Sequence, residues 1–130
     1  MKEKKLKVLI ASPQAGERAI IGRVFSQAGH AVGEVAGYEA ALEKLRQDGF
    51  NLLIVAEVFN GGSGLELITA ALRLDYTINS GLITSMDKKS FHEATDGLGL
   101  AGLIPWPVDE AGAADFLATI EDLRQALNRR

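Results

Sequence analysis

The sequence has no cysteine among its 130 residues, only three prolines and 6% aromatic residues. The missing cysteine excludes disulfides, thiolate metal ligands and cysteine nucleophiles. No apolar run approaches the roughly 18 residues that a membrane-spanning helix needs. An excess of positive charge is missing too, because 14 Lys and Arg stand against 17 Asp and Glu. Nucleic-acid-binding domains usually carry a clustered basic excess, so this balance argues against that class.

The residues that are present are typical of a folded domain. Apolar residues make up 47% of the chain and charged residues 24%, a balance found in globular proteins. The length fits one domain, residues 1–130. We expect residues 1–6, which are rich in lysine, to be a flexible lead-in, and we expect no output domain. The apolar run that follows is too short for a signal peptide, so we expect a cytoplasmic protein with no membrane partner.

Short apolar segments alternate with amphipathic ones along the chain. The apolar segments of strand length are residues 7–11, 31–36, 52–56, 81–84 and 101–104. Each is followed by apolar residues at helical spacing. Ser63 and Glu66 form a capping-box pair, and Asp87 and Asp109 are favoured N-cap residues, so three helix starts are predicted. The alternation predicts an α/β fold with a parallel sheet covered on both faces.

Ligands of open parallel sheets bind beyond the carboxyl ends of the strands. In this chain the residues at those ends are Ser12–Pro13, Ala56–Glu57, Thr84–Ser85 and Pro105–Pro107. They come from four of the five predicted strands. A functional site is therefore expected where these short segments meet.

The sequence resembles the receiver domain of two-component response regulators, the CheY-like family, over residues 7–127. The segments that carry the resemblance are KVLI (7–10), GHAV (29–32), EAAL (39–42), FNLLIV (50–55), GLEL (64–67), LITS (82–85), GLAG (99–102) and Pro107. None is specific alone, but their order and spacing together are. The resemblance implies a flavodoxin-like (βα)5 fold, with a five-stranded parallel sheet in the order 2-1-3-4-5 and helices on both faces.

Receivers use five groups for phosphotransfer, and the resemblance places them on five residues here. The acidic pair that holds Mg²⁺ falls on Ser12 and Pro13, and the aspartate acceptor falls on Ala56. The Thr or Ser and the Lys that bind phosphoryl oxygens fall on Thr84 and Trp106. Only Thr84 keeps the expected residue type. The resemblance therefore implies a degenerate phosphorylation pocket, or pseudo-receiver, which binds no metal or other cofactor and is not an enzyme.

Several of these residues also have purely structural interpretations. Ser is a favoured N-cap and Pro is favoured in the first helical position, which accounts for Ser12 and Pro13. Glu57 would mimic a phosphorylated acceptor if the preceding strand slipped by one residue. Such a slip would reverse every side chain of the strand, so we expect Glu57 to face solvent.

Three further features leave alternatives open. The glycine-rich segment 60–64 could bind an anion at a helix start, but it lacks the P-loop ending and we favour a flexible loop. Thr84 is either a remnant of the phosphate switch or a hydroxyl bonded to backbone. Trp106 fills the emptied pocket, anchors a partner or packs under the last loop. The Trp106–Pro107 bond is expected to be cis, as the corresponding bond is in receivers.

Receivers form dimers and bind effectors through the fourth helix, the fifth strand and the fifth helix. The candidate partner or dimer surface of this chain is Lys88, His92, Leu103, Trp106 and Ala113. Leu103 stands where receivers usually carry a Tyr or Phe that reports activation, so aromatic-coupled switching is not expected. His30 is expected to be a surface residue without a metal-ligand partner.

Three functions remain open at this point. The first is a signalling module of a two-component or phosphorelay system that works independently of phosphorylation. It would contact a protein partner, such as a sensor kinase or an effector, or form a homodimer through the last strand and helix. The second is a small-molecule or nucleotide-binding domain that uses segment 61–64, Thr84 and Trp106. The third is a receiver phosphorylated on an unconventional residue, namely Ser12, Thr84 or Ser85.

Overall fold

The central strand of the sheet, β3 (Leu52–Ala56), consists of five consecutive buried residues. It lies between β1 (Lys7–Ala11) and β6 (Asn79–Thr84), while β2 (Ala31–Val35) and β7 (Gly102–Pro105) form the edges. Neighbouring strands are parallel, in the order β2-β1-β3-β6-β7. This computed structural model, which describes residues 5–59 and 61–128, confirms the predicted order 2-1-3-4-5, with β6 and β7 as the fourth and fifth strands.

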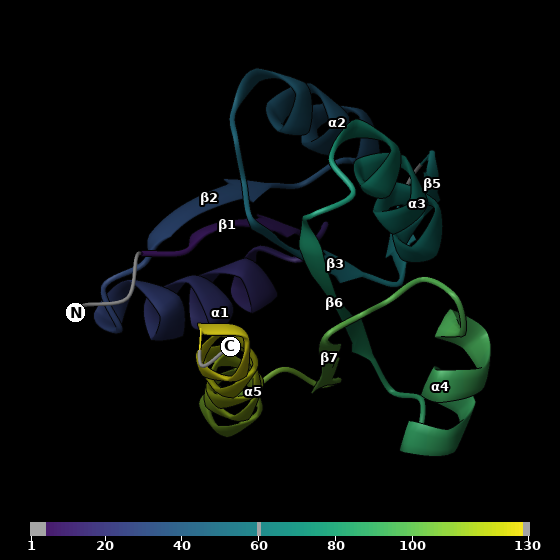
Figure 1. Ribbon diagram of the computed structural model, residues 1–130. Coiled ribbons are helices and arrows are strands. Elements are labelled where there is room, and N and C mark those ends of the chain that lie inside the picture. The colour runs from purple at the N-terminus through teal and green to yellow at the C-terminus, as the bar shows by residue number, and fades with distance from the viewer. Residues whose placement is uncertain (1–4, 60, 129–130) are drawn as a thin grey trace.

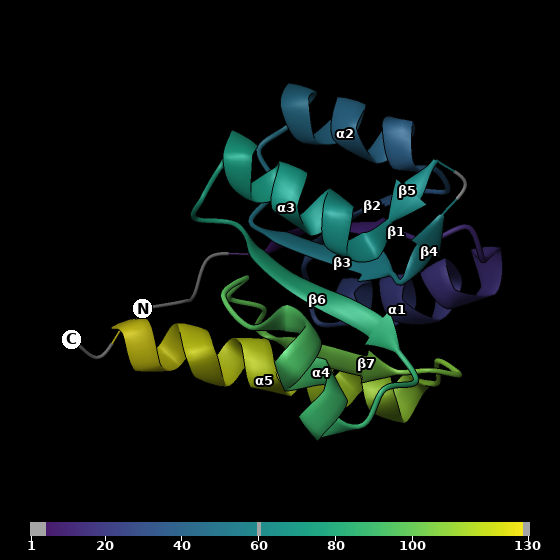
Figure 2. The same cartoon turned by 90° about the vertical axis from the view of Figure 1, so that its right-hand side faces the viewer.

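Helices cover both faces of the sheet (Figure 1). They are α1 (Ala15–Gln27), α2 (Tyr38–Gln47), α3 (Gly64–Leu74), α4 (Lys88–Thr95) and α5 (Glu110–Asn128). Figure 2 shows α2 and α3 on one side of the sheet and α5 on the other. Helices α1 and α5 contact each other, as do α2 and α3. In the described part of the chain, no helix is both long and apolar enough to span a membrane.

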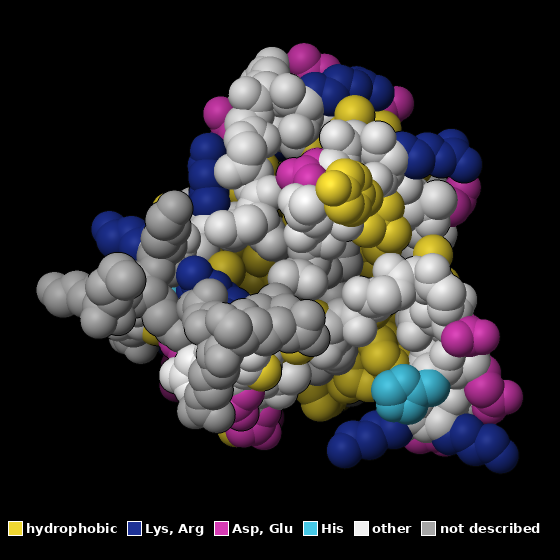
Figure 3. Space-filling view, in the orientation of Figure 1, with side chains coloured by type: hydrophobic (Ala, Val, Ile, Leu, Met, Phe, Trp, Pro, Cys, Tyr) yellow, Lys and Arg dark blue, Asp and Glu magenta, His cyan; other side chains and the backbone are white. Residues whose placement is uncertain are grey.

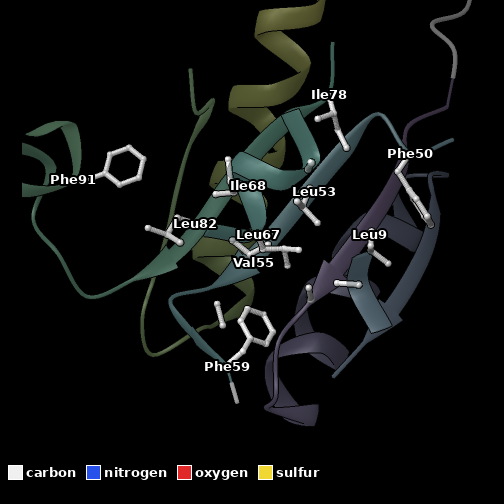
Figure 4. Packing of buried hydrophobic residues seen from close by; sticks show 14 residues of the cluster. Leu9, Phe50, Leu53, Val55, Phe59, Leu67, Ile68, Ile78, Leu82 and Phe91 are labelled. Carbon is white, nitrogen blue, oxygen red and sulfur yellow. The ribbon is translucent and has the colours of Figure 1, made fainter. Parts of the chain in front are cut away.

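The core is divided into two clusters by the sheet itself. Successive residues of a strand point to opposite faces. In β3, Leu53 and Val55 therefore pack with residues of α2, α3 and α4, whereas Leu52 and Ile54 pack with residues of α1 and α5. Figure 4 shows the first of these clusters. This burial on both faces explains why β3 is an uninterrupted apolar run.

A second, two-stranded sheet follows β3 where the sequence predicts a flexible loop. Strands β4 (Val58–Phe59) and β5 (Gly62–Ser63) pair antiparallel. A Cβ at Gly62 would lie 2.6 Å from the Tyr38 ring, so this hairpin packs tightly against α2. Strands of two residues have no alternation for a pattern to detect. Asn60, the first residue of the glycine-rich segment, lies outside the described residues.

Two predictions near the N-terminus are wrong. Leu6 is buried, with 3% of its surface exposed, and its carbonyl oxygen accepts the Ala31 N–H at 2.9 Å. Its own N–H donates to Nδ1 of His30 at 3.0 Å, and the His30 side chain is only 8% exposed. The expected lead-in therefore ends before Leu6, because Leu6 already bonds to His30 and to Ala31, the first residue of β2. His30 is not a surface residue. Residues 1–4 lie outside the described residues.

Gly64, the first residue of α3, packs closely against the end of β3. This contact provides a test of the fold. A Cβ at Gly64 would lie 2.1 Å from the Ala56 carbonyl oxygen. We predict that Gly64→Ala lowers the free energy of unfolding by about 1–3 kcal/mol, the usual cost of overpacking. The matched control is Gly16→Ala in α1, where an added Cβ would meet no heavy atom within 4 Å other than its chain neighbours and the backbone of its own helix.

The control should leave stability unchanged or raise it by up to about 1 kcal/mol, because alanine favours the helix. Urea unfolding measures both variants. Equal stability changes in the two variants would contradict the tight contact at Gly64.

Candidate functional site

A pocket of about 280 Å³ lies at the carboxyl ends of the strands. The described residues that line it belong to the strand ends, to the loops that follow them or to the first turn of α1: Pro13, Gln14, Glu17, Ala56, Glu57, Val58, Ile83, Ser85 and Trp106. The predicted residues Pro13, Ala56 and Trp106 are thus brought together. Ser12 and Thr84 are buried and each bonds to a lining residue.

Glu57 is directed to Thr84, which contradicts the prediction that it faces solvent. The Thr84 Oγ1 accepts the backbone N–H of Met86 at 3.0 Å and donates to Oε1 of Glu57. A hydroxyl can donate only one proton, and a carboxylate has none to donate. The Thr84 hydroxyl therefore accepts the Met86 N–H and donates its own proton to the Glu57 carboxylate. Thr84 is therefore bonded both to backbone and to an acidic side chain, and the two interpretations left open for it are compatible.

The direction of Glu57 does not depend on a register slip. Ala56 pairs with Ile83 and Val55 pairs with Leu82, as the ungapped alignment predicts. Glu57 lies in a bend after the last paired residue, where strand alternation no longer sets the side-chain direction. Its carbonyl oxygen accepts the Gly64 N–H at 2.8 Å, which holds the bend against the start of α3.

On the opposite side of the pocket, the Ser12 hydroxyl is bonded in the same way as that of Thr84, to one backbone N–H and to one carboxylate. Its Oγ accepts the Gln14 N–H at 3.0 Å and donates to Oε1 of Glu17 at 2.7 Å. Helix α1 begins at Ala15 with Gln14 as N-cap. The prediction that Ser12 is the N-cap and Pro13 the first helical residue is therefore wrong by two positions. The backbone N–H of Ser12 instead donates to the Val35 carbonyl at 3.1 Å and continues the pairing of β1 with β2.

At the positions that the resemblance assigns to phosphotransfer, the side chains can be compared with the groups that a receiver uses. Ala56 ends β3 without a nucleophile, and Pro13 has no side-chain oxygen for a metal. The Ser12 hydroxyl is already used by two partners. Within residues 5–59 and 61–128, no group of three or more His, Cys, Asp or Glu side chains could hold a metal ion. The donor set for Mg²⁺, which prefers carboxylates in octahedral geometry, is therefore not assembled at these positions.

The hydroxyls named as unconventional acceptors differ in accessibility. Ser12 and Thr84 are buried and both donate to a carboxylate. Ser85 is exposed and lines the pocket. Only Ser85, among these three hydroxyls, is both accessible and placed at the pocket.

Trp106 lies beside the pocket and does not fill it. Its side chain is 56% exposed, although it is one of the lining residues. The backbone N–H of Trp106 donates to the Thr84 carbonyl oxygen at 3.0 Å, which extends the pairing of β7 with β6 by one residue. The bond to Pro107 is cis, as predicted. Exposure of an indole is the arrangement expected for a contact residue rather than for one packed under a loop.

In the described part of the glycine-rich segment, hydrogen bonds within the chain occupy N–H groups at the start of α3. Ser63 is the N-cap of α3, and its Oγ accepts the Glu66 N–H at 3.1 Å. The Glu66 carboxylate accepts the Ser63 N–H at 3.0 Å, and the Gly64 N–H is bonded to Glu57. The capping box is therefore confirmed, and it uses N–H groups that an anion would need.

A second pocket, of about 390 Å³, lies between α4, β7 and α5. Its lining includes three of the predicted partner-surface residues, Lys88, His92 and Leu103. Figure 3 shows hydrophobic surface in this hollow, between the ends of α4 and α5. Ala113 is completely buried against the sheet, so its assignment to a partner surface is wrong. Trp106 belongs to the first pocket and not to this one.

The helix starts near this second pocket follow the predicted N-caps. Asp87 Oδ1 accepts the Ser90 N–H at 2.7 Å, and Asp109 Oδ1 accepts the Gly112 N–H at 2.8 Å. The backbone and side-chain hydrogen bonds from Ser90 lower the pKa of Asp87 below its usual value. Because the folded pKa is lowered, the stabilisation is present above the unfolded pKa and is lost as the pH falls through the folded value.

Comparisons with known proteins identify the fold. No model of a protein family matches the chain, and no curated protein does. A CheY-like receiver domain protein from Methanospirillum hungatei JF-1 has a TM-score of 0.81 at 18% identity, with 97% of this chain and 98% of that chain covered. The REC domain of the response regulator AraT from Geobacillus stearothermophilus has a TM-score of 0.78 at 25% identity, with coverage of 95% and 99%.

Chemotaxis response regulator CheY4 of Vibrio cholerae matches similarly, with a TM-score of 0.79 at 18% identity over 88% of this chain and 98% of that chain. Solved structures of response regulators thus cover almost the whole chain. The strand order of the sheet agrees with them. The chain therefore has the fold of a CheY-like response-regulator receiver domain.

The hydrogen bonds of Thr84 can be tested through stability. Thr84→Val removes a hydroxyl from a buried site and leaves the Met86 N–H and Glu57 without this partner. We predict that the free energy of unfolding falls by about 1–3 kcal/mol, the usual cost of a buried polar group left unsatisfied. Thr119→Val is the matched control, because the Thr119 hydroxyl is exposed and bonds only to its own helix.

The control should change the free energy of unfolding by less than about 0.5 kcal/mol. Guanidinium unfolding, followed by circular dichroism, measures both variants. If Thr84→Val is as stable as the unmodified protein, the bond contributes nothing to holding the pocket.

Proposed function

We propose that the chain is a receiver-like signalling module that acts by protein–protein contact and independently of phosphorylation. The observation that carries the proposal is the hydrogen bond from Thr84 to the Glu57 carboxylate, next to Ala56 at the acceptor position. In the receivers that the sequence resembles, the hydroxyl at this position binds a phosphoryl oxygen. Here it already binds an anionic oxygen supplied by the chain itself.

Glu57 thus provides one feature of a phosphorylated acceptor, an anionic oxygen bonded to the Thr84 hydroxyl. It places a carboxylate at the end of β3 and engages the hydroxyl that ends β6. The interaction is internal, so no kinase is needed to form it and no phosphatase removes it. We infer a fixed conformation of the loop after β6, in which Met86 is also held through Thr84. A permanently formed contact supports a module whose signal is set by its partner.

The partner in this proposal is a protein of a two-component or related pathway, with a sensor kinase or an effector as the candidates. The resemblance to receivers supports this choice, and it also supports a cytoplasmic location. The hollow between α4, β7 and α5, with Lys88 and His92 at its side, is the second place where a partner could bind. A homodimer through the last strand and helix would use this face.

The other two functions receive less support. Within segment 61–64, the N–H groups of Ser63 and Gly64 are used by the capping box and by Glu57, which removes a part of the proposed nucleotide site. Phosphorylation of Ser12 or Thr84 would have to break a partly buried hydrogen bond to a carboxylate at each hydroxyl. Ser85 is accessible, but its neighbours at the lysine and acidic positions, Trp106 and Pro13, supply no positive charge and no metal ligand.

Acetyl phosphate with Mg²⁺ tests the proposal directly. We expect no phosphoryl mass increase by intact-mass spectrometry, because the acceptor, the acidic pair and the lysine are all replaced. A receiver that carries all five groups serves as the positive control in the same reaction. The variant Ala56→Asp restores the acceptor alone and should remain unlabelled, because the metal and the lysine are still missing.

Stoichiometric labelling of the unmodified chain would overturn the proposal. Peptide mapping would then locate the phosphoryl group on Ser12, Thr84, Ser85 or another residue. Labelling of Ala56→Asp alone would show that the remaining groups still support phosphotransfer and that only the acceptor was lost.

A further inference from the structure

The pocket at the carboxyl ends of the strands carries negative charge without a cation of its own. Its described lining contains Glu17 and Glu57, and no Lys, Arg or His. Both carboxylates accept hydrogen bonds from uncharged hydroxyls, those of Ser12 and Thr84. Such bonds orient a carboxylate but leave its net charge in place. The pocket therefore presents two oriented carboxylates to whatever enters it.

A nearby arginine of the chain does not neutralise this charge. Arg18 donates from Nη1 to the Ser12 carbonyl at 2.7 Å, and its Nε lies 3.4 Å from Glu34. Its side chain is 18% exposed, and it is not among the lining residues. The guanidinium of Arg18 is thus committed to other groups. None of the described residues that line the pocket supplies a cation.

Exposed apolar side chains flank the same pocket. Val58 is 72% exposed and Trp106 is 56% exposed, and both line it. They come from distant parts of the sequence, since Val58 begins β4 and Trp106 follows β7. An indole face attracts cations more strongly than other aromatic rings. A fitting ligand therefore has an apolar stem and a cationic end.

We propose that this pocket receives the side chain of an arginine from a protein partner. The three methylene groups of arginine would lie along Val58 and Trp106, and the planar guanidinium would stack on the indole and reach Glu17 and Glu57. Two carboxylates match the several N–H donors of one guanidinium. The inference rests on the proposed function, because it names the chemistry by which a protein partner is recognised.

Size and charge favour one side chain over other occupants. A volume of about 280 Å³ is below the usual range of cofactor and drug-sized sites, which begins near 300 Å³. Nucleotides and other anions would be repelled by the two carboxylates. A lysine ammonium would also be attracted by the two carboxylates, but it could not stack on the indole as a planar group or form paired hydrogen bonds.

Binding of a short arginine peptide can be followed by NMR. The chain has a single tryptophan, so its indole N–H gives one signal that reports on the pocket. The peptide acetyl-Ala-Arg-Ala-amide is titrated into the full chain, and the Trp106 signal is followed. We expect saturable shifts with a dissociation constant in the millimolar range, since one side chain buries little surface. The same peptide with citrulline, which is nearly isosteric and uncharged, should bind about tenfold more weakly.

Charge-removing variants locate the binding site. Glu57→Gln and Glu17→Gln keep an oxygen that accepts from Thr84 or Ser12, so the fold should be retained. Each should weaken the arginine peptide about three- to tenfold. Glu93→Gln, at an exposed position of α4 outside the pocket, is the matched control and should leave the affinity unchanged. Added NaCl should weaken the unmodified complex.

Three results would overturn the inference. The first is equal binding of the arginine and citrulline peptides. The second is free argininamide binding more tightly than the peptide, which would indicate a small-molecule ligand. The third is a stronger response of the Trp106 signal to MgCl₂ alone, which would indicate a metal site. None of these readouts involves acetyl phosphate, so a failure of the arginine site is distinguishable from a failure of phosphorylation independence.

Discussion

The hydrogen bond between Thr84 and Glu57 joins the ends of two neighbouring central strands, β6 and β3. The same residue also holds the start of α3, because the Glu57 carbonyl oxygen accepts the Gly64 N–H. The hairpin β4–β5 leaves from this bend and places Val58 beside the pocket. The charge of the pocket and its apolar edge therefore both depend on the position of Glu57.

The fold agrees with that of receivers although four of the five residues that the resemblance assigns to phosphotransfer differ in type, and this separation has a physical basis. The free energy of folding comes mainly from burial of apolar residues in the two clusters on either side of the sheet. At the carboxyl ends, the exposed residues Pro13, Ser85 and Trp106 contribute little to that burial and can change without loss of the fold. Structures that share only 18–25% identity with this chain thus match it over most of its length. Function has to be argued from the site and not from the fold.

The sheet and the positions of the site could be predicted from sequence, because both follow from burial. A run such as 52–56 has one plausible place, in the middle of a parallel sheet, and the residues that follow such strands must meet at one edge. The direction of Glu57 could not be predicted, since alternation ends with the last paired residue, Ala56. Glu17 was missed because it comes from a helix rather than from a strand end.

The wrong assignment of Ala113 to a partner surface could have been avoided from the sequence. Ala113 belongs to a helical series with Phe116, Leu117 and Ile120, all of them buried. That spacing predicts an inward position even for a small residue. Leu6 and His30 gave no comparable signal, because their burial depends on a contact between residues 24 positions apart. Long-range pairing of this kind is visible only in the folded chain.

A double-mutant cycle on Glu57 and Thr84 tests the central claim most directly. The free energies of unfolding of Glu57→Ala, Thr84→Val and the double variant are compared with that of the unmodified chain. The account predicts a favourable coupling energy of at least about 1 kcal/mol, since the two side chains share a hydrogen bond to a charged group. Additive effects, with a coupling energy near zero, would show that the two residues act independently and would contradict the account.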